Sequence, residues 1–221
     1  MKKIFICTLS VAFLAAGLAS CGKSTKGKMA NEWKVTEYNS TETETESNGD
    51  KTVYTTTMTE STVSNSTATT SGGSTVTTTS TGTVNTNEMT IEKDGTWTST
   101  TDVSSTQEIF GVTATTKVTT TSSGTWSFVG KTKGDEFKKN ERVMFNTLSE
   151  TTTTAYTPQG GSTQTSTDTD SYMTGENVMI YTVTESKGKE LALEAEIGNS
   201  STSGGTTSST SGKTTIKLTE K

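Results

Sequence analysis

Apolar residues recur at every second position in several short segments of the chain after residue 30. These pairs and triplets are Trp33/Val35, Met89/Ile91, Trp126/Phe128, Val143/Phe145, Leu191/Leu193/Ala195 and Ile216/Leu218. Successive side chains of a β-strand point to opposite faces, so each set is expected on one buried face. No segment in this region has the spacing of an amphipathic helix. The pattern therefore predicts an all-β protein.

Turn residues separate these segments at two places. Asp94-Gly95 lies between the alternating residues 89–91 and Trp97, which is a strong hairpin signal. The run 186–189, Ser-Lys-Gly-Lys, predicts another turn, which leads into the strand that contains Leu191. Neighbouring strands are thus expected to be antiparallel.

Long tracts of Thr, Ser and Gly lie between the apolar strands. Three times, two such arms flank paired glycines: 52–70 and 75–86 around 72–73, 151–157 and 163–169 around 160–161, and 196–203 and 206–216 around 204–205. Threonine is β-branched and favours strands. We expect three long hairpins that are polar on both faces, with a disordered loop as the alternative at each tip.

The first 21 residues follow a different pattern. An apolar run from Ile4 to Leu18 follows Lys2-Lys3 and ends in Ala19-Ser20-Cys21. The run is shorter than the roughly 20 residues that span a bilayer as a helix, and it has the order of a signal peptide. We therefore expect a signal peptide over 1–20, followed by a tether over 21–30 and one folded domain over 31–221.

Composition decides between a folded chain and a disordered one. Only 27% of the residues are hydrophobic, which alone would favour disorder. However, roughly a quarter of the residues are threonine, and the chain has one proline. We expect one folded domain with a thin core and long solvated strands.

The charge of the chain argues against nucleic acid as a partner. Without Lys2 and Lys3, 17 of the 19 basic residues remain against 24 acidic residues, a side-chain charge of −7. The expected mature chain also keeps no cysteine that could form a disulfide, because Cys7 lies in the signal. We expect a monomer.

Leu18-Ala19-Ser20-Cys21 resembles the lipobox of bacterial lipoproteins. The resemblance implies that the sulfur of Cys21 takes a diacylglyceryl group and that the membrane is a partner through this lipid. The alternative is an ordinary secretory signal with a chance cysteine. In such lipoproteins, aspartate after the cysteine retains the protein in the inner membrane, and acidic residues mark surface export. Gly22 and the basic residues that follow match neither, which favours the cell envelope, at the periplasmic face of the outer membrane.

Four short motifs resemble the lipocalin-like domains of Bacteroidota lipoproteins. They are Glu32-Trp33-Lys34-Val35, Lys93-Asp94-Gly95-Thr96-Trp97, Gly124-Thr125-Trp126-Ser127-Phe128 and Glu190-Leu191-Ala192-Leu193. The resemblance spans about 31–218, and it departs from the family pattern at the first strand, where no glycine precedes Trp33. It implies an antiparallel up-and-down β-barrel that binds a small hydrophobic molecule or a lipid.

Residues for catalysis are scarce. The chain has no histidine, which removes Ser-His-Asp catalysis and most zinc sites. A glycosidase needs two carboxylates across a cleft from each other. The pairs Asp135/Glu136 and Glu194/Glu196 are better explained as solvated charges in a turn and on the outer face of a strand. Asp168-Thr169-Asp170 hints at calcium, but Met173 stands where an EF-hand loop has glycine. We expect that the protein is not an enzyme and that it binds neither a cofactor nor a metal ion.

Aromatic residues are the remaining candidates for a site. Trp33, Trp97, Trp126 and Phe128 either line a ligand cup or plug the base of the barrel as core residues, and the second interpretation is the more common one. Two functions follow from the sequence. One is a membrane-anchored carrier of a small hydrophobic molecule or lipid. The alternative is an envelope scaffold or interaction protein whose Thr-rich hairpins contact glycan or another protein.

Overall fold

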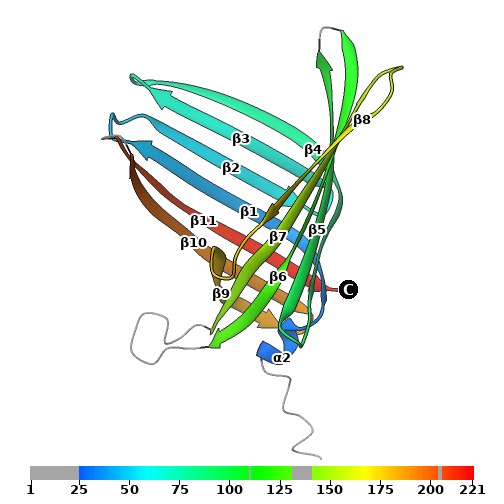
Figure 1. Cartoon of the computed structure of the whole chain (residues 1–221), viewed down its shortest axis with the longest axis vertical. Coiled ribbons are helices and arrows are strands. Elements are labelled where there is room, and N and C mark those ends of the chain that lie inside the picture. The colour runs from blue at the N-terminus through cyan, green and yellow to red at the C-terminus, as the bar shows by residue number, and fades with distance from the viewer. Residues whose placement is uncertain (1–24, 110, 131–140, 204–205) are drawn as a thin grey trace, which may run out of the picture.

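The computed structural model describes residues 25–109, 111–130, 141–203 and 206–221 (Figure 1). These residues form one short helix and the strands of a single sheet. The elements are α2 (Thr25–Met29), β1 (Glu32–Glu46), β2 (Lys51–Thr59), β3 (Thr62–Ser71), β4 (Ser74–Ile91), β5 (Thr96–Ile109), β6 (Val112–Gly130), β7 (Glu141–Pro158), β8 (Gln164–Ser171), β9 (Asn177–Lys187), β10 (Glu190–Ser203) and β11 (Thr206–Glu220).

Ten of these strands form a closed antiparallel up-and-down barrel, and β8 is an extra strand paired with β7. The ring is completed where β1 pairs with β11, and β6 pairs with β7. Closing the sheet pairs strand edges that would otherwise be exposed at the base. The all-β barrel expected from the sequence is confirmed.

Both short turns expected from the sequence are present. β4 and β5 are joined through Asp94-Gly95, where Gly95 has a φ of 94°, and the carboxylate of Asp94 accepts hydrogen bonds from Thr96. β9 and β10 are joined through Gly188, which has a φ of 59°. Both φ values fall in the left-handed region, which glycine adopts without steric cost.

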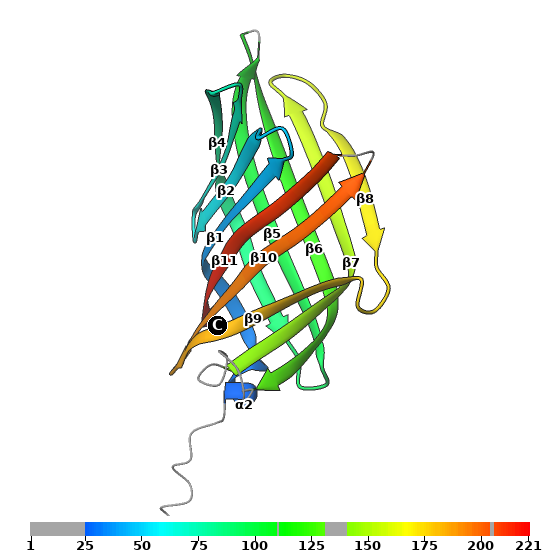
Figure 2. The same cartoon turned by 90° about the vertical axis from the view of Figure 1, so that its left-hand side faces the viewer.

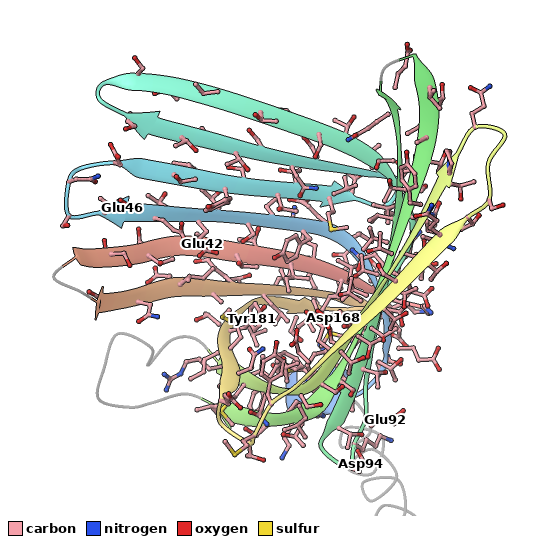
Figure 3. All side chains as sticks on the ribbon, turned by 45° about the horizontal axis from the view of Figure 1, so that its top comes forward. Glu42, Glu46, Glu92, Asp94, Asp168 and Tyr181 are labelled. Atoms are coloured by element: carbon pink, nitrogen blue, oxygen red, sulfur yellow. The ribbon has the colours of Figure 1, made fainter. Side chains whose placement is uncertain are left out.

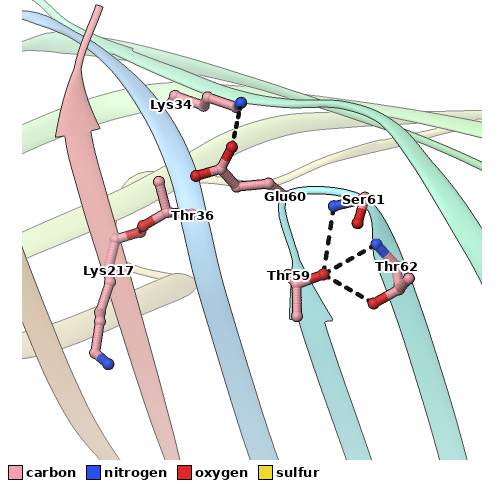
Figure 4. Close-up of polar contacts among 7 residues, drawn as sticks. All are labelled: Lys34, Thr36, Thr59, Glu60, Ser61, Thr62 and Lys217. Atoms are coloured by element: carbon pink, nitrogen blue, oxygen red, sulfur yellow. Dashed lines mark hydrogen bonds and ion pairs between the residues drawn. The ribbon is translucent and has the colours of Figure 1, made fainter.

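The three Thr-rich hairpins are found with one correction. β7 pairs with β8, and β10 pairs with β11 up to Ser203 and Thr206, while the tip at 204–205 lies outside the described residues. The arm expected over 52–70 is not one strand. It turns between β2 and β3, where the Thr59 hydroxyl oxygen accepts hydrogen bonds from the amides of Ser61 and Thr62 at 3.3 and 3.0 Å (Figure 4). This turn uses neither glycine nor proline, so the sequence gives no strong sign of it.

The main core lies at the base of the barrel. Its buried members are Met29, Trp33, Val35, Ile91, Trp97, Trp126, Val143, Phe145, Val183, Leu191, Leu193 and Leu218. At this end β1 pairs with β4 over Glu32–Lys34, whereas higher up the β2–β3 hairpin lies between them. The ring is therefore narrower at the base, where apolar side chains fill it, and wider above.

Helix α2 lies beside the base (Figures 1 and 2). Met29 is fully buried, and its carbonyl oxygen accepts a hydrogen bond of 2.9 Å from the indole nitrogen of Trp33. The ammonium of Lys28 donates to the carbonyl of Ser186 at 3.3 Å. The described part of the segment expected as a tether therefore packs on the barrel.

The wall of the barrel divides above the base. β9 pairs with β7 over Glu141–Thr147 and with β10 over Glu190–Glu194. Beyond these residues, β8 replaces β9 on the edge of β7 that faces away from β6. The described part of β10 from Ala195 pairs with β11 alone. Figures 1 and 2 show the upper strands diverging into two groups, one with β1–β4, β10 and β11, and the other with β5–β8.

Candidate functional site

A cavity of about 460 Å³ lies inside the barrel, directly above the core. Its volume is in the range of small-molecule sites. Most strands of the ring contribute to it: its apolar lining comes from Val35, Tyr38, Met58, Met89, Trp97, Phe145, Met179, Tyr181, Leu193 and Ile216. We call this cavity the cup.

Three aromatic rings form part of the lining of the cup. Trp97 and Phe145 meet edge to face with centroids 5.6 Å apart, and Phe145 and Tyr181 do so at 5.9 Å. This geometry is favourable and holds the rings in place. Burial raises the pKa of the Tyr181 phenol far above its ordinary value, with a further contribution from Tyr38. The phenol of Tyr181, which borders the cup, therefore stays neutral well into the alkaline pH range.

Polar groups lie higher on the wall of the cup. The hydroxyl of Ser122 donates to the carboxylate of Glu150 at 3.0 Å. The hydroxyl of Thr101 donates to the side-chain oxygen of Asn87 at 3.1 Å. The cup thus has an apolar floor and a polar upper wall, which is the arrangement that accommodates an amphiphilic molecule.

Carboxylates continue up the inner face above Glu150. Tyr38 borders the cup, and alternation along β1 places Glu42, Glu44 and Glu46 on the same face. On the other wall, Asp168 and Asp170 of β8 pair in register with Thr152 and Glu150 of β7. Figure 3 labels Glu42, Glu46 and Asp168 on these two walls. We call these six residues, Glu42, Glu44, Glu46, Glu150, Asp168 and Asp170, the inner carboxylates.

Basic residues of the described strands lie on the opposite, outer face. The ion pairs found there are Lys34–Glu60, Lys117–Asp102, Lys213–Glu194, Lys217–Glu37 and Lys221–Glu88. Lys217 and Glu37 are 2.6 Å apart, and this contact lowers the pKa of Glu37 and raises that of Lys217. Lys34 of β1 lies 2.6 Å from Glu60, and Figure 4 draws this contact.

The residues singled out in the sequence fall into two groups. Trp97 borders the cup, whereas Trp33, Trp126 and Phe128 belong to the packing of the base below it. The indole nitrogen of Trp126 donates to the carbonyl of Glu92 at 2.7 Å, which fixes the ring there. Ligand binding by any of the four stays a prediction.

Of the two carboxylate pairs singled out in the sequence, Glu194/Glu196 is the described one, and it does not line the cup. Glu194 and Glu196 lie on the outer face of β10, where Glu194 contacts Lys213 at 2.8 Å. Asp168 and Asp170 lie in a strand rather than in a loop. Cys21, Asp135 and Glu136 lie outside the described residues.

Sequence reasoning missed Tyr38 and Glu150 because of two bulges. The register shifts between Val35 and Glu37, and it shifts again on β7 at Leu148. Each extra residue reverses the alternation, so strict period-two counting from Val35 or Phe145 assigns Tyr38 and Glu150 to the outer face. No local signal in the sequence marks either bulge.

Comparison of the chain with models of protein families, with curated proteins and with solved structures found no match in any of the three. Among the described residues, no helix has the length and apolar character needed to cross a membrane. The same part of the chain contains no group of three or more histidine, cysteine, aspartate or glutamate side chains placed to hold a metal ion.

Proposed function

We propose that this protein is a lipid-anchored, lipocalin-like binding module whose cup takes a small hydrophobic molecule or the chain of a lipid. The observation that carries the proposal is the cavity of about 460 Å³ with an apolar floor inside an antiparallel barrel. An apolar cavity of this size releases ordered water when an apolar ligand fills it. The proposal assigns no catalytic step to the protein.

The anchor proposed at Cys21 gives the cup an orientation. Helix α2 begins four residues after Cys21, and it packs against the base of the barrel. Four residues span at most about 14 Å. A lipid on Cys21 would therefore hold the base near the membrane, and the cup would open away from it. The ligand would then arrive from the aqueous side, at the periplasmic face of the outer membrane.

Binding of decanol, an uncharged probe, to the purified full chain tests the cup. We expect a saturable change in tryptophan fluorescence, because Trp97 borders the cavity. Ser99→Phe places a ring inside the cup and should abolish the change. Thr98→Phe, the neighbouring residue on the outer face, is the matched control and should leave it intact. Equal binding by both variants would show that decanol binds elsewhere.

The anchor has its own test. Cys21→Ser should abolish metabolic labelling of the protein with a radiolabelled fatty acid and delay removal of the signal. Unchanged labelling would contradict the lipobox interpretation.

A second function is favoured by the upper hairpins. They are ordered strands rather than loose loops along their described length, and β8 and the upper part of β10 keep edges that pair with no described strand. Such edges and the Thr-rich faces beside them suit contacts with glycan or another envelope protein. Limited proteolysis distinguishes this scaffold role: rapid cleavage at all three hairpin tips of the folded protein would argue against it.

A further inference from the structure

The inner carboxylates point to a particular class of ligand. We propose that the cup binds an amphiphile with a cationic head group, an ammonium or a guanidinium, whose apolar body fills the floor of the cup. This inference rests on the proposed function of the cup and narrows its ligand.

The first argument concerns the position of Glu150. Its side chain borders the cup, so a molecule whose apolar end contacts Phe145 and Leu193 has this carboxylate beside its upper part. Glu150 also lies directly across from Asp170 in the β7–β8 register. Like charges in directly opposite positions destabilise a strand pair. A cation bound between them would remove this repulsion.

The second argument concerns where the compensating charges are. All seven basic residues of the described strands, which are Lys34, Lys51, Lys117, Arg142, Lys187, Lys213 and Lys217, alternate to the outer face. The five ion pairs of the described residues lie outside the barrel as well. No basic residue of the described strands therefore shares the inner face with these carboxylates.

Clefts lined by one sign of charge concentrate the field of those charges and attract ligands of the opposite sign. The inner carboxylates occupy both walls above the cup, Glu42, Glu44 and Glu46 on β1 and the other three on β7 and β8. A fatty acid or another anionic amphiphile has to pass these charges before it reaches the apolar floor. The same walls favour entry of a cation.

Trp97 carries an unpaired hydrogen-bond donor beside the cup. The side chain of Trp97 is 7% exposed and borders the cup, and its indole N–H finds no hydrogen-bond acceptor among the described residues. Buried donors in native proteins nearly always have a partner. This nitrogen is itself shielded from the open space of the cup, so a ligand oxygen would reach it only after the indole ring moved.

Three probes of equal chain length test the inference on the full chain: decylammonium, decanol and decanoate, each below its micelle concentration, by isothermal titration calorimetry at neutral pH. We expect decylammonium to bind about tenfold more tightly than decanoate at low salt, in line with one charge-assisted contact. The ratio should shrink as salt is added, because salt screens the inner carboxylates.

Substitutions locate the head group. Glu150→Gln and the double variant Asp168→Asn/Asp170→Asn should each reduce the preference for decylammonium over decanoate. Glu196→Gln removes a carboxylate from the outer face of the wall and is the matched control, which should keep the full preference.

The outcomes separate the two proposals. If decanol binds but decylammonium and decanoate bind equally, or decanoate binds more tightly, the cationic ligand is wrong and the cup remains a binding site. A preference that neither inner-face variant changes would also overturn the inference. If no probe binds, decanol included, the proposed function itself fails.

Discussion

At Gly124, β6 and β7 lie so close together that there is no room for a side chain. A Cβ atom built on Gly124 would overlap the carbonyl oxygen of Asn146, which belongs to the backbone of the neighbouring strand. It would also meet the indole nitrogen of Trp97 at 3.0 Å, so the absence of a side chain leaves room for this indole beside β6. Glycine is therefore required here for close packing rather than for an unusual φ angle.

Gly124→Ala should lower the free energy of unfolding by about 2 kcal/mol, because the strands must move apart to admit the methyl group. Gly198→Ala is the matched control, since a Cβ at Gly198 meets nothing within 4 Å. Urea denaturation followed by circular dichroism measures both. A Gly124→Ala variant as stable as Gly198→Ala would show that the strands adjust freely.

Individual residues also mark the limit of prediction from sequence. Period two correctly placed Trp33, Val143 and Leu193 on one buried face, because side-chain direction in an unbroken strand is fixed by geometry. It failed for Tyr38 and Glu150, which follow bulges. A bulge depends on how a partner strand pairs, so that information is not local to the strand that carries it.

At the scale of elements, each long strand has two distinct halves. The residues of β4 from Ser74 to Thr81 are exposed on both faces, whereas Val84 and Ile91 in its lower half are buried. Stability in the upper half therefore depends on ladder hydrogen bonds and contacts between polar side chains, such as the 2.8 Å bond between the hydroxyls of Thr70 and Thr75. Such exposed polar contacts contribute little each.

Hydrogen–deuterium exchange should reveal these halves. We expect amides in peptides covering 74–81 to exchange faster than those covering 84–91, because segments with few buried apolar contacts open locally at lower free energy. Mass spectrometry of peptic fragments resolves the two segments. Equal protection would mean that the hairpins unfold together with the base.

Elements were predictable where their signal was local. The turns at Asp94-Gly95 and Gly188 were predictable, because those residues favour turns on their own. The helix α2 was not predictable, since five residues are too few to form a stable helix alone and Gly27 disfavours a helix further. What stabilises it is the burial of Met29 against the base, a contact that exists only in the folded barrel.

At the scale of the molecule, stability is concentrated at one end. The large buried cluster occupies the base, and the second cluster contains only Met58, Val63 and Val84 among its buried members. The buried hydrophobic residues are therefore not spread evenly: 12 of the 17 in the described part of the chain belong to the cluster at the base. The long walls above add surface for contacts without adding much core.

Leu193→Ala should cost about 2 to 5 kcal/mol of unfolding free energy, the range for a large-to-small change at a buried core position. Ile197→Ala, four residues further up the same face of β10, is the control and should cost clearly less because its side chain is only half-buried. Thermal and urea denaturation compare the two. Equal losses would mean that the upper wall contributes as much to stability as the base.

The pairing of β1 with β11 also constrains the order of events in time. Trp33 pairs in register with Glu220, so the first strand of the barrel is completed by the last described one. During synthesis or export, β1 exists long before β11 emerges, and ring closure has to wait for nearly the whole chain. Strands that wait with open edges are prone to aggregate, and charged side chains discourage this. The glutamates spaced along β1 would then discourage aggregation of the chain before the barrel has closed and the cup has formed.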